Sequence, residues 1–201
     1  MKRIVVLASG RGSNFQAVID KVADRTIPAE ICCLITDNPE AYAIKRAEEV
    51  GVPVTVINVS TYPDRSAYDS ALEAAMTEAK ADLFILAGYM QLLSPETVRR
   101  FALKMINIHP ALLPSFSGLH AQQQAINYGV KVAGCTVHFV DEGMDSGPVI
   151  LQRSVPVLDN DTEDSLAERI LFEEHYALPE AVRLFCTDSL QIEGRRVTIT
   201  P

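Results

Sequence analysis

The stretch Lys104-Met105-Ile106-Asn107-Ile108-His109-Pro110-Ala111-Leu112-Leu113-Pro114 is an apolar strand that ends in two polar residues and then meets a proline. Alternate side chains of a strand point to the same face, so Asn107 and His109 are predicted to project side by side. Pro110 cannot continue a strand ladder, and it therefore ends the strand. An amide can donate to a developing oxyanion and an imidazole can carry a proton, so the pair suits acyl-type transfer.

The chain before this stretch alternates between apolar runs and helical patterns. Strands are predicted at residues 3–7, 30–35, 52–56 and 82–86, and helices at 13–24, 41–50, 65–79 and from 94 onward. This rhythm is typical of an α/β fold with a Rossmann-like, mainly parallel twisted sheet and helices on both faces. In such sheets ligands bind outside the carboxyl ends of the strands, which is where Asn107 and His109 are expected.

The chain after this stretch has a different pattern. It predicts a helix at 120–128, strands at 130–140 and 148–155, a long helix at 162–185 bent at Pro179, and a terminal hairpin within 190–199. We therefore expect a C-terminal part with antiparallel strands and a long helix. The whole of 1–201 is expected to form one domain, with a Rossmann-like half at about 1–100 and a catalytic half at about 101–201.

The composition is that of a globular protein and excludes several classes of function. Of 201 residues 48% are hydrophobic, the net charge is −8 and the pI is about 5.0. No basic stripe is present, which argues against nucleic acid as a partner. No apolar run reaches membrane-spanning length, and no signal-type cleavage site follows the first strand. Four cysteines without a C-x-x-C pair indicate reduced thiols and no metal site, so the cytoplasm is the expected location.

The first predicted strand leads into Ser9-Gly10-Arg11-Gly12-Ser13-Asn14-Phe15. Glycines between a strand and a helix let a ligand approach the backbone, and the helix start offers free amides to an anion. A dinucleotide fingerprint needs a third glycine where Phe15 stands, so a terminal monophosphate fits better. The alternative is a tight structural turn with Ser13 as the helix N-cap.

A second loop, at residues 141–147, is acidic and rich in glycine. Its spacing does not match a calcium loop, because Gly143 stands where an oxygen ligand is needed. It is either a solvated turn or the carrier of Asp145 to His109, where a carboxylate would orient the imidazole and favour its protonated form. His138, in an apolar run, is expected to be structural rather than catalytic.

Five motifs occur in an order that resembles one enzyme family. They are Gly10-x-Gly12-Ser13-Asn14, Leu86-Ala87-Gly88-Tyr89-Met90, Asn107-Ile108-His109-Pro110-x-Leu112-Leu113-Pro114, His138-Phe139-Val140 through Asp145-x-Gly147, and Glu174-His175. Together they cover essentially the whole chain and resemble the phosphoribosylglycinamide formyltransferases, the folate-dependent enzymes of purine synthesis. The resemblance implies formyl transfer from 10-formyltetrahydrofolate to the amine of glycinamide ribonucleotide, with no metal.

The resemblance also assigns roles to individual residues. It implies a catalytic trio of Asn107, His109 and Asp145. The residues implied to hold the phosphoribosyl substrate are Gly12, Ser13, Asn14 and Glu174. Those implied to bind the folate are Arg65 at its carboxylate tail and, around the pterin, Met90, Gln91, Leu92, Leu93, Asn107, Val140, Asp141, Glu142, Gly143 and Met144. Position 91 is Gln where a basic residue can occur, and position 111 is Ala where Ser is frequent.

Three rival interpretations stay open at this point. Formyltetrahydrofolate deformylase resembles a chain with an additional N-terminal regulatory domain, and methionyl-tRNA formyltransferase resembles a longer chain with a basic C-terminal domain. Neither is expected here, because the first strand begins at residue 3 and the net charge is −8. A nucleotide-binding module without catalysis would use the Gly10–Asn14 loop but would have no need for Asn107 and His109. A homodimer also remains possible, because the sequence carries no signature of oligomeric state.

Overall fold

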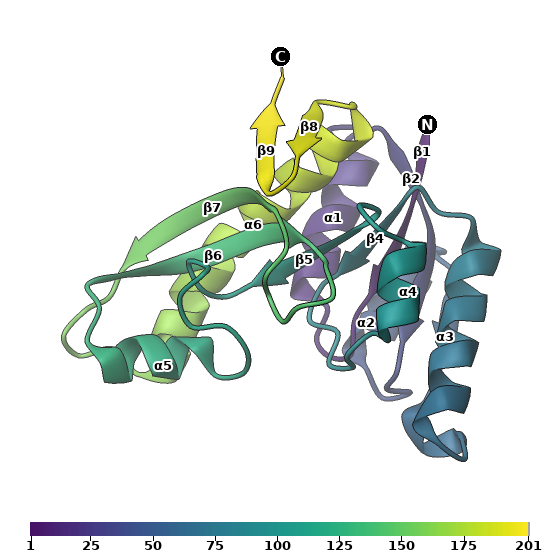
Figure 1. Ribbon diagram of the computed structural model, residues 1–201, viewed down its shortest axis with the longest axis horizontal. Helices are drawn as coiled ribbons and strands as arrows, with labels where there is room; N and C mark the ends of the chain where they lie inside the picture. The colour runs from purple at the N-terminus through teal and green to yellow at the C-terminus, as the bar shows by residue number, and fades with distance from the viewer. Residues whose placement is uncertain (201) are drawn as a thin grey trace. The chain divides into compact units, whose positions relative to one another are not determined.

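The computed structural model describes residues 1–200 (Figure 1). It consists of two compact units, Met1–Ile106 and a second that begins at Asn107. A seven-stranded sheet has the order β3-β2-β1-β4-β5-β6-β7, and a two-stranded sheet is formed by β8 and β9. The predicted α/β class with a mainly parallel sheet is thereby confirmed, whereas the prediction of a single domain stays a prediction.

In the first unit, β1 (Lys2–Leu7) lies between β2 (Ala29–Thr36) and β4 (Leu83–Leu86), and β2 also pairs with β3 (Val54–Val56). All these pairings are parallel. The strands β1 and β4 are runs of Ile, Val, Leu and Phe that are buried from Ile4 to Leu7 and throughout β4. Continuous apolar runs are expected of parallel strands with both faces covered. Because these strands are parallel, the loops that follow β1, β2 and β4 all leave at the carboxyl ends of the strands, on the same side of the sheet.

The helices of the first unit are α1 (Ser13–Ala23), α2 (Tyr42–Glu49), α3 (Arg65–Ala79) and α4 (Pro95–Arg100). Right-handed crossovers place α1 and α2 on one face of the sheet and α3 on the other, as Figure 1 shows. Asp64 caps α3 through the amide of Ala67, and Ser94 caps α4, in which Pro95 is the first residue. A short 3-10 helix, η1 (Val59–Thr61), was not predicted.

The second unit begins within β5 (Met105–His109), and the last three residues of this strand belong to the second unit. After α5 (Ala121–Tyr128), the strands β6 (Val132–Phe139) and β7 (Val149–Pro156) form an antiparallel pair. The long α6 (Glu163–Cys186) packs against both strands, starts with a capping box at Thr162 and continues through Pro179. The terminal hairpin predicted from the sequence is present as β8 (Leu190–Glu193) and β9 (Arg196–Ile199).

Candidate active site

Three polar side chains of the second unit converge although they are far apart in the sequence. Asn107 and His109 stand at the end of β5, and Asp145 lies in the loop after β6. The Oδ2 atom of Asp145 is 3.4 Å from Nδ1 of His109 and accepts a hydrogen bond of 2.8 Å from the amide of Gly118. The structure therefore brings together the imidazole and the carboxylate whose contact the sequence left open.

The ring of His109 is buried, with 5% of its surface exposed. Its Nε2 atom lies 2.9 Å from the carbonyl oxygen of Phe116, which can only accept, so Nε2 carries a proton. On the other side, 3.4 Å to Asp145 is longer than the 2.7–2.9 Å or so of a charge-assisted hydrogen bond. Nδ1 is therefore held less tightly by Asp145 than Nε2 is by the Phe116 carbonyl.

Asn107 is held by a histidine that sequence reasoning had placed in a structural role. The Nδ2 atom of Asn107 is 3.3 Å from Nε2 of His138, while Nδ1 of His138 is 2.8 Å from the carbonyl oxygen of Phe139. Because the carbonyl fixes the proton on Nδ1, a neutral His138 accepts from the Asn107 amide at Nε2. This contact orients the amide of Asn107. The sequence did contain a signal for this contact, because a histidine within an apolar strand is expected to be buried and then needs hydrogen-bond partners.

The surroundings of His138 favour its neutral form. Burial lowers the pKa of His138, against the raising effects of the Phe139 carbonyl and the Asp145 carboxylate, whose Oδ1 is 3.8 Å from Nε2. A protonated ring could no longer accept from Asn107. The orientation of the amide therefore depends on a neutral His138.

This pKa shift predicts a dependence of stability on pH. The pKa of His138 in the folded chain lies below the ordinary value of 6.5, so between the two values the unfolded chain binds more protons. The stabilisation is present above pH 6.5 and is lost as the pH falls through the folded pKa. We expect the free energy of unfolding in urea to fall between pH 7 and pH 5, and to fall less steeply in His138→Gln. Equal slopes in the two proteins would contradict this.

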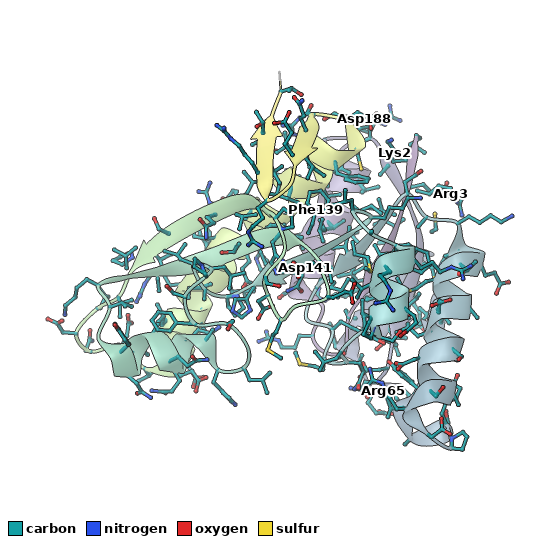
Figure 2. The ribbon with its side chains drawn as sticks, in the orientation of Figure 1. Lys2, Arg3, Arg65, Phe139, Asp141 and Asp188 are labelled. Carbon is teal, nitrogen blue, oxygen red and sulfur yellow. The ribbon has the colours of Figure 1, made fainter. Side chains whose placement is uncertain are left out.

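The loop at 141–147 is folded around the carboxylate of Asp141. Its Oδ1 accepts from the amide of Gly143 at 3.1 Å and from the hydroxyl of Ser146 at 2.6 Å. This Asx-type turn gives the Asp141 side chain a structural role. Figure 2 shows Asp141 just beyond Phe139, the last residue of β6. Within residues 1–200, no group of His, Cys, Asp and Glu side chains is arranged to hold a metal ion.

In the first unit, the loop after β1 separates the roles of its two glycines. Gly12 has φ +67, and a Cβ there would lie 2.8 Å from Cβ of Ala43, so the fold itself requires glycine. Gly10 has an ordinary φ, and an added Cβ would meet nothing within 4 Å. Packing therefore explains Gly12 but does not explain Gly10. The alternative with Ser13 as the N-cap was wrong, because Gly12 is the N-cap and Ser13 is the first residue of α1.

The carbonyl groups of this loop are turned toward protein donors. Asn38 donates to the oxygen of Ser9 at 3.1 Å, the amide of Ala43 to Gly10 at 3.1 Å, and Arg46 to Arg11 at 2.9 Å. The loop therefore presents few free acceptors. Asn14 is buried and Ser13 half-buried at the positive end of α1, which favours an anion there.

The remaining predicted ligand residues occupy three places. Figure 2 shows Arg65 at the start of α3, where it pairs with Asp69 at 2.8 Å and donates to the carbonyl of Leu92. Glu174 is buried on α6. Burial of the Cys135 thiol raises its pKa to about 12, and the charge of Glu174 contributes to this increase. Three of the predicted pterin residues are exposed apolar side chains, at 67%, 66% and 59%: Met90, Leu92 and Met144. Gln91 and Leu93 are half-buried, as is Val140, whereas Glu142 is exposed.

Comparison with known proteins decides the family. Residues 2–182 match the family model described as formyl transferase. The phosphoribosylglycinamide formyltransferase of Mycobacterium tuberculosis is 42% identical over 98% of this chain and 91% of its own length. The chain belongs to the formyl transferase family. A solved glycinamide ribonucleotide transformylase 1 from Symbiobacterium toebii is 49% identical, with a TM-score of 0.97 over 100% of this chain and 95% of that one.

Other curated relatives of this formyl transferase are much longer. The human trifunctional purine biosynthetic protein adenosine-3 is 43% identical over 94% of this chain. The match covers 19% of the human protein and 14% of the Drosophila melanogaster one. The formyl transferase chain thus spans a fifth or less of the length of these trifunctional relatives.

A solved structure named for a different activity shares the fold. A formyltetrahydrofolate deformylase from Pseudomonas syringae has a TM-score of 0.93 over 100% of this formyl transferase and 66% of its own chain, at 27% identity. Backbone similarity at 0.93 and 0.97 does not separate the two activities. The sequence is more similar to the transformylase, at 49% identity. Within residues 1–200, no helix is long and apolar enough to cross a membrane.

Proposed function

We propose that this chain transfers the formyl group of 10-formyltetrahydrofolate to the amine of 5-phosphoribosylglycinamide, in the synthesis of purines. The products are formylglycinamide ribonucleotide and tetrahydrofolate. The observation that supports it most is the cluster of Asn107, His109 and Asp145 in a chain 42% identical to a phosphoribosylglycinamide formyltransferase. A binding module without catalysis has no use for this cluster. We place the reaction in the cytoplasm.

The reaction begins with the primary amine of the glycinamide. Its nitrogen attacks the formyl carbon, a new C–N bond forms, and the electrons of the C=O bond move to the oxygen. Asn107 and a protonated His109 donate to this oxyanion. Because the negative charge develops only as the bond forms, these hydrogen bonds stabilise the transition state more than the bound substrates. The attacking amine loses a proton, the oxyanion electrons re-form the C=O bond as the bond from carbon to the folate nitrogen breaks, and that nitrogen takes up a proton.

Asp145 supports this step in two ways. Its carboxylate faces Nδ1 of His109 and compensates the positive charge of a doubly protonated ring. We assign to its second oxygen, which is 3.8 Å from Nε2 of His138, the binding of a water that moves the proton from the amine to the folate nitrogen. Phe116 complements this arrangement, because its carbonyl keeps a proton on Nε2 of His109.

We place the two substrates on different groups of residues. The phosphate lies on Gly12, Ser13 and Asn14, and the ribose hydroxyls on Glu174. The pterin lies along Met90–Leu93 and Val140–Met144, where exposed Met90, Leu92 and Met144 offer apolar contact. Arg65 faces the carboxylates of the folate tail and must share its guanidinium with Asp69 to do so.

A substrate-omission assay tests the proposal. The protein is incubated with 10-formyltetrahydrofolate, with and without glycinamide ribonucleotide, and tetrahydrofolate is followed by absorbance. Turnover that needs the amine supports the transferase. Turnover without the amine identifies the hydrolysis named for the Pseudomonas syringae relative, and no turnover under either condition points to a binding module.

The two glycines of the first loop give a separate prediction about the phosphate. Gly10→Ala should leave the unfolding temperature unchanged, because the added methyl group meets no protein atom. It should raise KM for the ribonucleotide by about tenfold if that methyl group displaces the phosphate from the amides of Gly12, Ser13 and Asn14, since a hydrogen bond to a charged group is worth about 1.5–3 kcal/mol. Gly12→Ala should lower stability by about 1–2 kcal/mol, because its backbone is left-handed and Ala43 is in the way. Thermal melts and KM measurements check both. An unchanged KM in Gly10→Ala would show that the phosphate does not occupy the open space beside Gly10.

A further inference from the structure

The segment Tyr89–Leu92, which follows β4, is held by four polar contacts, one for each of its residues. The Tyr89 hydroxyl bonds to the Tyr68 hydroxyl, and the Met90 amide donates to Oγ of Ser9 at 2.8 Å. The Gln91 side chain donates to Asp37 at 2.8 Å, and the Leu92 carbonyl accepts from Arg65. These partners come from the ends of β1 and β2 and from α3.

The contact between Asp37 and Gln91 differs from the other three. Gln91 donates from Nε2 to Oδ2 of Asp37, while Oδ1 of the same carboxylate is buried and has no hydrogen-bond partner within residues 1–200. A buried acceptor without a donor destabilises a protein, and such groups are uncommon. Burial raises the pKa of the Tyr68 and Tyr89 hydroxyl groups, and the Asp37 carboxylate stands close enough to both to raise their pKa further.

The segment itself exposes apolar surface. Met90 is 67% and Leu92 66% exposed, and they flank Gln91, which points back to Asp37. Exposed apolar side chains on a segment fixed by four contacts make a rigid apolar platform. Fixing a binding segment in advance lowers the conformational entropy that a ligand must overcome, so the contacts that fix it contribute to affinity.

We propose that Asp37 is a positioning residue for the formyl donor: by holding Gln91 it fixes the Met90–Leu93 segment on which the pterin ring docks. This inference rests on the proposed function and adds a residue that the sequence did not single out. Asp37 does not touch the substrate. It acts through a single amide donor, whereas an arginine at position 91 could donate to both carboxylate oxygens in parallel.

A purely structural Asp37 would be expected to have both oxygens satisfied. Instead one oxygen has no hydrogen-bond partner among residues 1–200, although Arg65 stands near the same tyrosines and is engaged with Leu92 and Asp69. We infer that the loss of stability from the unpartnered oxygen is tolerated because the carboxylate holds Gln91. Asp37 thus resembles other groups that sacrifice some stability at a binding site.

The first test separates donor binding from catalysis. Asp37→Ala should raise KM for 10-formyltetrahydrofolate by about tenfold, the scale expected from losing one hydrogen bond to a charged group. Neither kcat nor KM for glycinamide ribonucleotide should change more than about twofold. Asp20→Ala is the matched control, because Gln16 donates to Asp20 at the same 2.8 Å in an exposed contact on α1. Asp37→Asn, which can still pair with the Gln91 amide, should lie within about threefold of the wild type.

The second test uses a gain of affinity and does not depend on how well Asp37→Ala folds. Gln91→Arg should lower KM for the formyl donor by about threefold when Asp37 is present, because both oxygens are then satisfied. Combined with Asp37→Asn, Gln91→Arg should bring no such gain. A gain of equal size in both backgrounds, or a donor KM within twofold of the wild type in Asp37→Ala, overturns the inference. If the unmodified chain transfers no formyl group, it is the proposed function that fails.

Discussion

Replacing Asp145 with asparagine is expected to lower kcat by about 10²–10⁴, the range typical of groups that support proton transfer. The backbone of Asp145 is left-handed, at φ +50, a conformation that asparagine tolerates and alanine does not. Asparagine can also keep accepting from the amide of Gly118. The variant therefore removes the negative charge next to His109 and leaves the loop in place.

The measurement is kcat and both KM values across pH 6 to 9, with unfolding followed in urea. If Asp145 supports a doubly protonated His109, the loss falls on kcat and the two KM values change little. Asp159→Asn removes the same charge from an exposed ion pair with Lys131 in the same unit and should leave kcat unchanged. An Asp145→Asn enzyme within tenfold of the wild type in kcat would show that the carboxylate is not part of the reaction.

The fold was accessible from the sequence because its signals are local. Pro95 after Ser94 indicates the start of α4, the capping residues at 162–165 indicate the start of α6, and Glu193-Gly194-Arg195-Arg196 indicates the terminal turn. Each depends on neighbouring residues, so backbone chemistry is enough to place it. The 3-10 helix η1 was missed because its single turn is capped by Asn58 inside what looks like a polar loop.

The contacts of the site were less accessible, for a physical reason. Asn107 meets His138 across 31 positions and Gln91 meets Asp37 across 54, and no local pattern specifies which strand ends become neighbours. Alternation along β5 predicts that Asn107 and His109 share a face, but it does not predict which side chain orients them. The N-cap of α1 shows the same limit: Ser13 suited that role locally, whereas the close approach of Ala43 places a glycine there.

The oxyanion interpretation makes a strong prediction for Asn107. Asn107→Ala should lower kcat by about 10²–10³, the usual loss when one donor to an oxyanion is removed. Asn107→Asp should lose at least as much, because a carboxylate of the same shape accepts where the amide donates and adds negative charge where negative charge develops. Single-turnover rates with both substrates bound measure this step apart from product release.

His138 makes the prediction for Asn107 sharper. Since His138 orients the amide through its Nε2, His138→Leu should lower kcat by a smaller factor, about tenfold, and should add little in combination with Asn107→Ala, since the group that it orients is already gone. Asn127→Ala on exposed α5, where the lost contact is with Gln123, is the matched control and should leave kcat unchanged. Losses for Asn107→Ala and His138→Leu that multiply in the double variant would mean that the two side chains act independently. The amide would then not be oriented by the histidine.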